Sequence, residues 1–445
     1  MFAIDDYSIF SPSSSDQTGD TFEKLRHLRQ DLHNRLIDIL DEDSILSLGD
    51  ESVLSARLDD LLEGLISSRY IRLNTTERKR LVREVVEEFK GMGPIAPLML
   101  DNSITDILIN GPGEIWVDRQ GTLSRTDLRF DDEPHLRRFL ERIVGAQGRQ
   151  LDARQPMVDA RLPDGSRLHA VIPPLCALGP VVSIRRFHHE HVDAAMLVES
   201  GFISLEMLQF LEIAVAAGIN IVISGSAGSG KTSLLNVISG YIPKTERIVT
   251  VEETAELHLQ HPHVIPLEAR SVNSEGAGAV TLRDLLRNAL RMRADRIIVG
   301  EVRGAEVLDM LQAMNVGHDG SLTTLHANSP RDVISRLETL AQMSETVVCR
   351  ETIEQMITSS VQLIVQVMRY REGSRRVVSI SELACTQGRY DVRELFTFKT
   401  NGMMKNQSIV GRHQSNGNDS FLTEQIAYKG FDAESYSRLA RGISL

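Results

Sequence analysis

The stretch "INIVISGSAGSGKTSLLNVI", residues 219–238, carries the strongest structural signal in this chain. An apolar run leads into Gly225, four further residues and then Gly230-Lys231-Thr232, which is the P-loop pattern. Glycines let the backbone fold closely around a phosphate, and the N–H groups at the start of the next helix supply positive potential. The stretch therefore predicts a strand, a phosphate-binding loop and a helix in succession.

Each position of this loop has an expected contact with ATP. Lys231 should pair with the β- and γ-phosphates, and the hydroxyl of Thr232 should bind Mg²⁺. The alternative is a glycine-rich turn that binds nothing, and the strand and helix on its two sides argue against it. The residues expected to surround the nucleotide are Gly225, Ser226, Ala227, Gly228, Ser229, Gly230, Lys231, Thr232 and Ser233.

Helical stretches alternate with short apolar runs from this loop onward. The runs are "NIVISG", "RIVTVEE", "DRIIVGEV", "GSLTTLHA", "VQLIVQV" and "RVVSISEL". Such alternation predicts parallel βαβ units and one sheet with helices on both faces. An α/β domain is therefore expected over residues 205–400, after a polar linker at 191–204 and before a weakly patterned C-terminal appendage at 401–445.

The chain before the linker is patterned differently. Residues 1–20 contain "SPSSSDQTGD" and are expected to be a disordered lead. Apolar residues then recur at helical spacing among charges, which predicts a helical region over 21–90. Short strand-like segments follow, with a hairpin expected around Asp164-Gly165. A smaller α+β domain is therefore predicted at 91–190.

The composition is that of an ordinary globular protein, with 42% hydrophobic and 25% charged residues and a formal charge of −12. The acidic excess opposes general attraction to DNA or to an anionic membrane, so we expect no direct nucleic-acid binding. The three cysteines show no metal-ligand spacing and fit a reducing compartment. An acidic N-terminus and the lack of an apolar run of ~20 residues predict a cytoplasmic protein that reaches a membrane through partners.

Three further segments carry candidate site residues at the ends of expected strands. They are "VTVEETAEL" at 249–257, "IIVGEVRG" at 297–304 and "GHDGSLTTLHANSPRDVISRL" at 317–337. In an open α/β sheet, ligands bind at the carboxyl ends of the strands. All three segments are therefore expected near the P-loop.

Together with the P-loop, these segments resemble the secretion ATPases of type II and type IV systems and of pili, in particular the CpaF-like branch that serves tight-adherence (Flp-type) pili. "GSAGSGKTS" is similar to the Walker A motif of that family, "VTVEETAEL" to its acidic box, "IIVGEVRG" to its Walker B motif and the third segment to its histidine box. The resemblance covers residues 80–385. It implies a homo-hexamer of two-domain subunits, with ATP and Mg²⁺ bound between an N-terminal domain and a RecA-like domain.

The resemblance also assigns the acidic residues. Gly300 stands where an aspartate is usually expected, but the Walker B strand of the family ends in glycine-glutamate. Glu301 would then act on the attacking water and, through water, on Mg²⁺, while Gly300 would be a close-packing position. The alternative for Glu301 is an ion pair with a neighbouring arginine. The acidic box has Glu252-Glu253 where the family usually has Glu-Asp, and whether Glu252 or Glu301 positions the water stays open.

Arginines and histidines complete the candidate site. The family pattern matches Arg167 and Arg185, which in relatives reach from the N-terminal domain toward the phosphates as arginine fingers. Solvent-exposed strand arginines are the alternative. His326 ends an expected strand and is placed to contact the γ-phosphate, His318 is a second candidate, and hydrogen-bonded structural histidines are the alternative for both.

A stripe of arginines lies outside these motifs. Arg283, Arg287 and Arg291 are four residues apart, so they share one face of an expected helix. A solvated or ion-paired face is the ordinary interpretation of such a stripe. A role at a subunit interface or in contact with a substrate is the alternative.

Three functions follow from these features. The first is an ATP hydrolase that powers assembly, and possible retraction, of a tight-adherence or type IV-like pilus or a secretion pseudopilus, through an inner-membrane platform protein and so only indirectly at the membrane. The second is the ATPase of a type IV conjugation or effector secretion system, or a DNA translocase. The third is a scaffold that binds ATP without hydrolysing it, against which Glu301 and the paired arginines argue.

Overall fold

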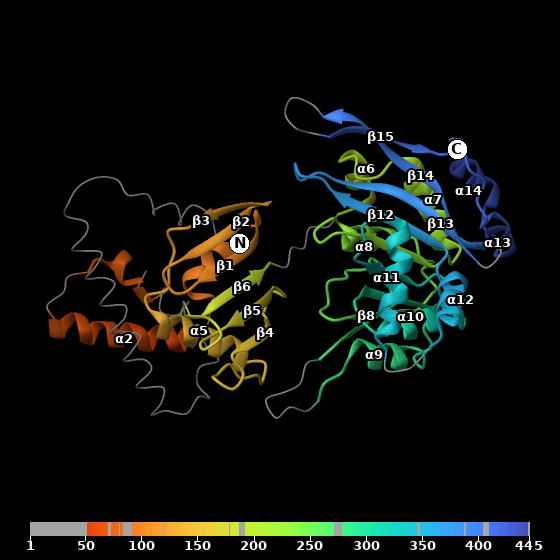
Figure 1. The fold of residues 1–445 in the computed structure, drawn as a ribbon. Coiled ribbons are helices and arrows are strands. Elements are labelled where there is room, and N and C mark those ends of the chain that lie inside the picture. The colour runs from red at the N-terminus through yellow and green to blue at the C-terminus, as the bar shows by residue number, and fades with distance from the viewer. Residues whose placement is uncertain are drawn as a thin grey trace. The chain divides into compact units, whose positions relative to one another are not determined.

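The chain divides into two units, Met1–His188 and His189–Leu445. Figure 1 shows the elements of each unit in the computed structural model. The structure describes residues 51–69, 73–79, 81–82, 91–119, 121–177, 179–186, 192–270, 278–344, 348–386, 389–403 and 409–443. The disordered lead expected at 1–20 lies outside these residues.

The helical region expected at 21–90 is described in part. Helix α2 covers Glu51–Arg69, and a second helical segment covers 75–79. Leu58, Leu62 and Leu65 on α2 are fully buried. Their spacing of four and three residues places them on one face of the helix, as amphipathic patterning predicts.

An antiparallel sheet in the order β3-β2-β1-β6-β5-β4 forms the centre of the first unit. Helix α5 begins after Asp132, whose carboxylate accepts a hydrogen bond from the His135 backbone N–H at 2.8 Å. Its apolar side chains join those of the strands in one core. The elements are α4 (Ala96–Leu100), β1 (Ile104–Asn110), β2 (Ile115–Arg119), β3 (Thr122–Arg125), α5 (Glu133–Gly145), β4 (Met157–Arg161), β5 (Arg167–Val171) and β6 (Val181–Arg185), after a 3₁₀ turn at Gly93–Ile95.

The two faces of this sheet differ in polarity. Side chains alternate along β6: Val182 and Ile184 are buried in the core, whereas Ser183 and Arg185 are exposed. Strands β4 and β5 show the same alternation, which is expected when a sheet buries one face only. The hairpin expected around Asp164-Gly165 is confirmed, because it joins β4 to β5.

The second unit contains a sheet in the order β15-β14-β13-β12-β7-β11-β10-β8-β9. The strands from β12 to β9 are parallel to their neighbours, as the alternation of helices and strands predicts. The predicted fold class is confirmed in its architecture: an α/β P-loop domain with a parallel sheet, preceded by a smaller α+β domain and N-terminal helices. The strands are β7 (Ile221–Gly225), β8 (Ile248–Glu252), β9 (Val264–Glu268), β10 (Arg296–Val302), β11 (Leu322–Leu325), β12 (Leu363–Arg369), β13 (Arg375–Thr386), β14 (Arg389–Met403) and β15 (Ile409–Ser415).

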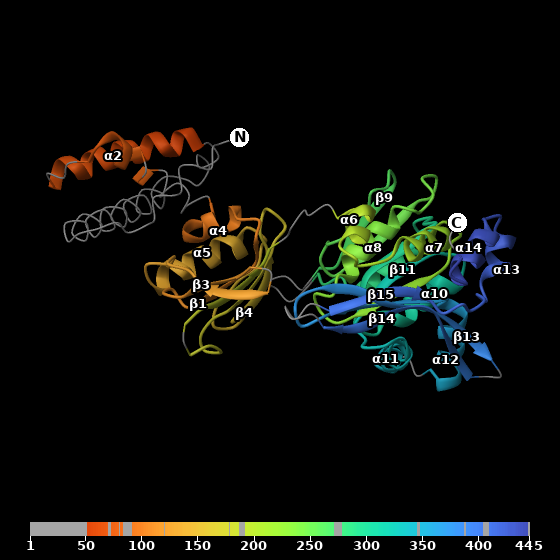
Figure 2. The ribbon, with the colours of Figure 1, turned by 90° about the horizontal axis from the view of Figure 1, so that it is seen from above.

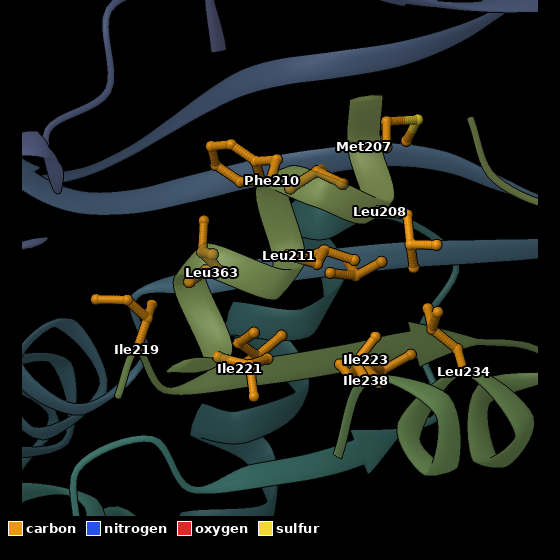
Figure 3. Close-up of a cluster of buried hydrophobic side chains, with 14 of the residues drawn as sticks. Met207, Leu208, Phe210, Leu211, Ile219, Ile221, Ile223, Leu234, Ile238 and Leu363 are labelled. Atoms are coloured by element: carbon orange, nitrogen blue, oxygen red, sulfur yellow. The ribbon is translucent and has the colours of Figure 1, made fainter. Parts of the chain in front are cut away.

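Helices cover both faces of this sheet, and Figure 2 shows α7 and α8 on one side and α11 and α12 on the other. Ile221 and Ile223 of β7 pack in the core with α7 and α8, which Figure 3 shows in close-up, while Val222 packs in the core of the opposite face. Because both faces are buried, the strand is continuously apolar. The helices are α6 (Ala194–Glu199), α7 (Leu205–Ala216), α8 (Lys231–Ser239), α9 (Leu282–Ala289), α10 (Glu306–Asn315), α11 (Pro330–Gln342), α12 (Arg350–Ser360), α13 (Thr423–Tyr428) and α14 (Ala433–Ala440).

One predicted strand runs in the other direction. "RVVSISEL" is expected in a parallel βαβ unit, but it belongs to β13, which is antiparallel to β12. Residues 370–374 alone connect the two strands. This connection is a tight hairpin, far shorter than the crossover of about a dozen residues that parallel strands need.

The segments expected as a linker and an appendage both contribute to the core of the second unit. Leu197 and Phe202, within 191–204, are buried in the same core as α7. At the other end, Tyr436 is fully buried and its ring stacks on Phe210 at 4.3 Å between centroids. The last part of the chain is therefore integrated with α7, although its sequence is weakly patterned.

Candidate active site

The P-loop follows β7 and fits tightly against β12. A Cβ atom on Gly225 would lie 2.3 Å from the Val367 carbonyl oxygen and 2.7 Å from Ser229 Oγ, so no larger residue fits there. The loop ends at Gly230, and α8 begins at Lys231. The predicted succession of strand, loop and helix is confirmed, with Thr232 and Ser233 in the first turn of the helix.

Lys231 is held at the centre of this loop. Its Nζ donates to the carbonyl oxygens of Gly225 and Ser226, each at 3.1 Å. The side chain is buried, and this burial lowers the pKa of Lys231. His326, at the end of β11, brings Nδ1 to 3.4 Å from Lys231 Nζ, so a histidine that lies 95 residues away in sequence meets the P-loop lysine.

His326 also approaches Glu301 on the neighbouring strand β10, with 2.6 Å between Nε2 and Oε1. Burial and the charge of Lys231 lower the pKa of His326, so the neutral ring is favoured. Lys231, His326 and Glu301 therefore form a continuous polar row from α8 across β11 to β10.

Arg303 holds the other oxygen of Glu301. Its terminal nitrogen and Nε lie 2.6 and 2.9 Å from Glu301 Oε2, and its second terminal nitrogen lies 3.0 Å from Glu253 Oε2. The ion pair considered as an alternative for Glu301 is thus present, and it also gives Glu253 of the acidic box a partner. Within the described residues, Oε1 of Glu301 is buried without an aligned hydrogen-bond donor, because the close His326 nitrogen does not point along a hydrogen bond.

Glu252 occupies a different environment from Glu301. It is 3% exposed, and its Oε2 accepts from the backbone N–H groups of Glu256 and Leu257 at 2.7 and 3.0 Å. Burial raises the pKa of Glu252 to about 7, against the opposing effect of these two N–H donors. A Cβ atom on Gly300 would lie 2.9 Å from Glu252 Cγ, so the close-packing interpretation of Gly300 is confirmed.

The two candidate histidines lie at opposite ends of one strand. His326 follows β11 at its carboxyl end, whereas His318 precedes it at the amino end, away from the edge where the P-loop lies. The carbonyl oxygen of His318 accepts from the Ser321 hydroxyl at 2.7 Å. The structure therefore brings His326, but not His318, to the P-loop.

The arginine stripe on α9 is ion-paired. Arg283 and Arg287 donate through Nε to the two carboxylate oxygens of Asp309, at 2.8 and 2.9 Å. Asp309 lies on α10 and is 9% exposed on its side chain. The ordinary interpretation of the stripe, an ion-paired helical face, is therefore correct for these two residues.

Arg167 and Arg185 belong to the first unit, on its polar sheet face. They lie directly opposite each other on β5 and β6, and Arg185 Nε donates to Asp106 Oδ1 at 3.2 Å. Arg161 on β4 lies opposite Arg167 in the strand register and extends the same cross-strand row, because the turn at Asp164-Gly165 joins the two strands.

The residues present fit a bound nucleotide with Mg²⁺. The Ser229 hydroxyl lies inside the P-loop, fully buried and without a hydrogen-bond partner among the described residues, and Glu301 Oε1 is a second such atom. Nowhere in the described ranges do three or more His, Cys, Asp or Glu side chains form a metal cluster. A magnesium ion would therefore depend on phosphate oxygens, the Thr232 hydroxyl and water held by Glu301.

None of the helices in the described part of the chain combines the length and the apolar character needed to cross a bilayer.

This chain is similar to known proteins. Residues 88–418 match the family described as "Type II/IV secretion system protein". A putative conjugal transfer protein of Mycobacterium tuberculosis is 40% identical over 323 residues, which cover 71% of this chain and 91% of that protein. The type IV secretion system protein PtlH of Bordetella pertussis is 31% identical over 64% of this chain and 91% of its own length. The crystal structure of the VirB11 ATPase from the Brucella suis type IV secretion system is 26% identical over 68% of this chain and 96% of that chain, with a TM-score of 0.36. The chain belongs to the type II/IV secretion system protein family and is an ATP hydrolase of that family.

Proposed function

We propose that this ATPase powers the assembly, and possible retraction, of a tight-adherence or type IV-like pilus, or of a secretion pseudopilus. The hydrolytic part of the proposal rests on one observation, the row in which Lys231 meets His326 and His326 approaches Glu301. The pilus part rests on the CpaF-like series of four motifs in order along the chain. The working form would be a homo-hexamer on the cytoplasmic side of the inner membrane, attached through a platform protein.

Hydrolysis at this site would need no covalent intermediate with the protein, because phosphoryl transfer is catalysed mainly by positioning and by charge. Lys231 would neutralise the β- and γ-phosphates, and Glu301 would orient the attacking water with Oε1 while Arg303 fixes Oε2. Neutral His326 would sense the γ-phosphate through the same row. Magnesium, when held by Thr232 and by water on Glu301, would neutralise charge that develops on the phosphates.

Glu252 is assigned a different task from Glu301. Its carboxylate is buried and turned toward the backbone of its own loop, so it is poorly placed to hold a water. We propose that Glu252 shapes the acidic box, which presents Glu253 to Arg303. Arg167 and Arg185 are proposed as arginine fingers that add positive charge in the transition state.

Two substitutions test the hydrolytic part. Lys231→Ala should abolish ATP binding and turnover, and in cells it should abolish surface fibres. Glu301→Gln keeps the size of the side chain but removes its charge, so it should bind ATP as the wild type does and lose most turnover, roughly a hundredfold or more by analogy with other single catalytic groups. Glu252→Gln is the comparison variant, and wild-type turnover in Glu301→Gln combined with loss in Glu252→Gln would reverse the assignment.

A second candidate is the ATPase of a type IV conjugation or effector secretion system, or a DNA translocase. Its relatives favour it, since they include a putative conjugal transfer protein and a type IV secretion system protein. The net charge of −12 and the aromatic content of 5% argue against direct binding to nucleic acid. ATPase rates of the wild type with and without single-stranded DNA separate the two functions. Strong stimulation by DNA supports DNA translocation. An unchanged rate, together with the loss of surface fibres in Lys231→Ala, supports pilus assembly.

A further inference from the structure

The hairpin between β12 and β13 lies beside the P-loop and carries two arginines in register. Arg369 ends β12, Arg375 begins β13, and the two residues are directly paired across the hairpin. The turn is closed by hydrogen bonds from Tyr370 N–H to Ser374 O at 2.8 Å and from Gly373 N–H to Tyr370 O at 3.0 Å. Paired residues of an antiparallel hairpin point to the same face, so the hairpin presents both guanidinium groups together.

Both arginines reach the same residue of the P-loop. Arg375 Nε donates to the Gly228 carbonyl oxygen at 2.9 Å, a contact between residues 147 positions apart in sequence. A terminal nitrogen of Arg369 lies 3.3 Å from the point where a Cβ on Gly228 would stand. The hairpin is therefore docked on the loop by Arg375, and Arg369 lies against the outside of that loop.

The charge on Arg369 has no counter-ion in the described part of the chain, where no residue forms a hydrogen bond or ion pair with its side chain. Glu372 in the same turn is occupied elsewhere, since it accepts from the Ser374 hydroxyl at 2.6 Å and from the Ile409 N–H at 3.2 Å. Like charges directly opposite each other on a hairpin destabilise it. An anion beside Arg369 would offset this repulsion.

The strand order explains which anion this would be. Strand β7, which leads into the P-loop, lies between β11 and β12. His326 and Glu301 approach the loop from the β11 side, and Arg369 approaches it from the β12 side. A polyphosphate chain bound in the loop would thus have hydrolytic groups on one side and arginines on the other. Guanidinium groups are well suited to phosphate, because their planar N–H groups match its oxygens.

We propose that the β12–β13 hairpin is a second phosphate-binding element of the nucleotide site. Arg369 binds an oxygen of the phosphate chain of a nucleoside di- or triphosphate, and Arg375 keeps the hairpin against Gly228. The inference rests on the proposed function only in that a nucleotide occupies the P-loop. The chemistry it names is the phosphate chain and not the base or the ribose.

The test measures the affinity of full-length protein for ADP and for inorganic pyrophosphate by calorimetry. Arg369→Ala should weaken both by the same factor, roughly ten- to hundredfold, which is the usual effect of losing a hydrogen bond to a charged group. Arg369→Lys should restore part of the loss. Arg371→Ala is the matched control, because it removes the same charge from an exposed position of the same hairpin. Among the described residues no hydrogen bond or ion pair joins Arg371 to the P-loop, so this variant should bind as the wild type does.

Three other results of these binding measurements would contradict the inference or the proposed function. Equal ADP affinity in Arg369→Ala and wild type, with Lys231→Ala deficient, would overturn the inference and leave the proposed function intact. A loss for ADP without a loss for pyrophosphate would overturn the phosphate assignment in favour of a contact with the nucleoside. Failure of the wild type itself to bind ADP would instead refute the proposed function. Thermal unfolding of Arg369→Ala and Arg369→Lys, with wild-type midpoints expected, separates these results from misfolding.

Discussion

Substituting Gly300 by alanine should destabilise the second unit, although the backbone angles at this position permit alanine. Gly300 is not among the glycines with left-handed backbone angles. A Gly→Ala change at such a position ordinarily stabilises a protein by about 0.4–1 kcal/mol, because it restricts the unfolded chain. Here the added Cβ would lie 2.9 Å from Glu252 Cγ and 3.3 Å from its Oε2. The structure therefore predicts the opposite sign from the general rule.

The magnitude follows from how firmly Glu252 is held. Its Cγ lies in the middle of a buried side chain whose carboxylate accepts two backbone N–H groups, so it cannot swing away freely. If Glu252 stays in place, overpacking of this kind costs about 1–3 kcal/mol; if it turns away instead, the lost hydrogen bond to a charged group costs about 1.5–3 kcal/mol. With the gain from the unfolded state subtracted, we expect a net loss of about 2 kcal/mol. For a domain of this size that lowers the midpoint of thermal unfolding by about 4–8 °C.

The assay is thermal unfolding of the wild type, Gly300→Ala, Glu252→Ala and the double variant. Glu252→Ala removes the atom that clashes, so Gly300→Ala should cost nothing when added to it, which gives a coupling free energy of about 2 kcal/mol. Gly145→Ala is the control, because no atom lies within 4 Å of its added Cβ. A Gly300→Ala midpoint equal to or above that of wild type, or additive effects in the double variant, would refute the packing argument.

Three further predictions concern buried polar and aromatic groups. Burial raises the pKa of Glu252 from 4.5 to about 7, so the folded state binds this proton more tightly than the unfolded state and stability falls as the pH rises through that window. Between pH 5 and 8 the wild type should lose on the order of 2–3 kcal/mol more than Glu252→Gln, as denaturant unfolding at both pH values would show. Tyr436→Ala should cost about 3–5 kcal/mol and expose the last helices to proteases, whereas Tyr436→Phe keeps the stacked ring and should cost about 1 kcal/mol. Asp309→Asn should cost about 1–3 kcal/mol in chemical unfolding, because it weakens both arginine contacts, and Arg287→Ala on the exposed side should cost less than about 1 kcal/mol.

Local sequence signals predicted much of the second unit. The P-loop, the parallel strands and the strand-end segments with Glu252, Glu301 and His326 are all signalled within short windows, because periodicity and turn residues act over a few positions. The exception is β13, whose apolar pattern does not contain the direction of the strand. The connection of residues 370–374 decides that direction, and a short connection permits only an antiparallel hairpin.

The side-chain partnerships depended on the tertiary structure. The local sequence was enough to predict a phosphate loop at the end of a buried strand and a glycine before Glu301. Only the folded chain shows that Gly300 leaves room for Glu252, that His326 lies beside Lys231 and that Arg375 reaches Gly228. These partners are 48, 95 and 147 positions apart, so no local pattern joins them. The sheet brings them together, because the carboxyl ends of its parallel strands meet along one edge and the antiparallel strand β13 begins at that same edge.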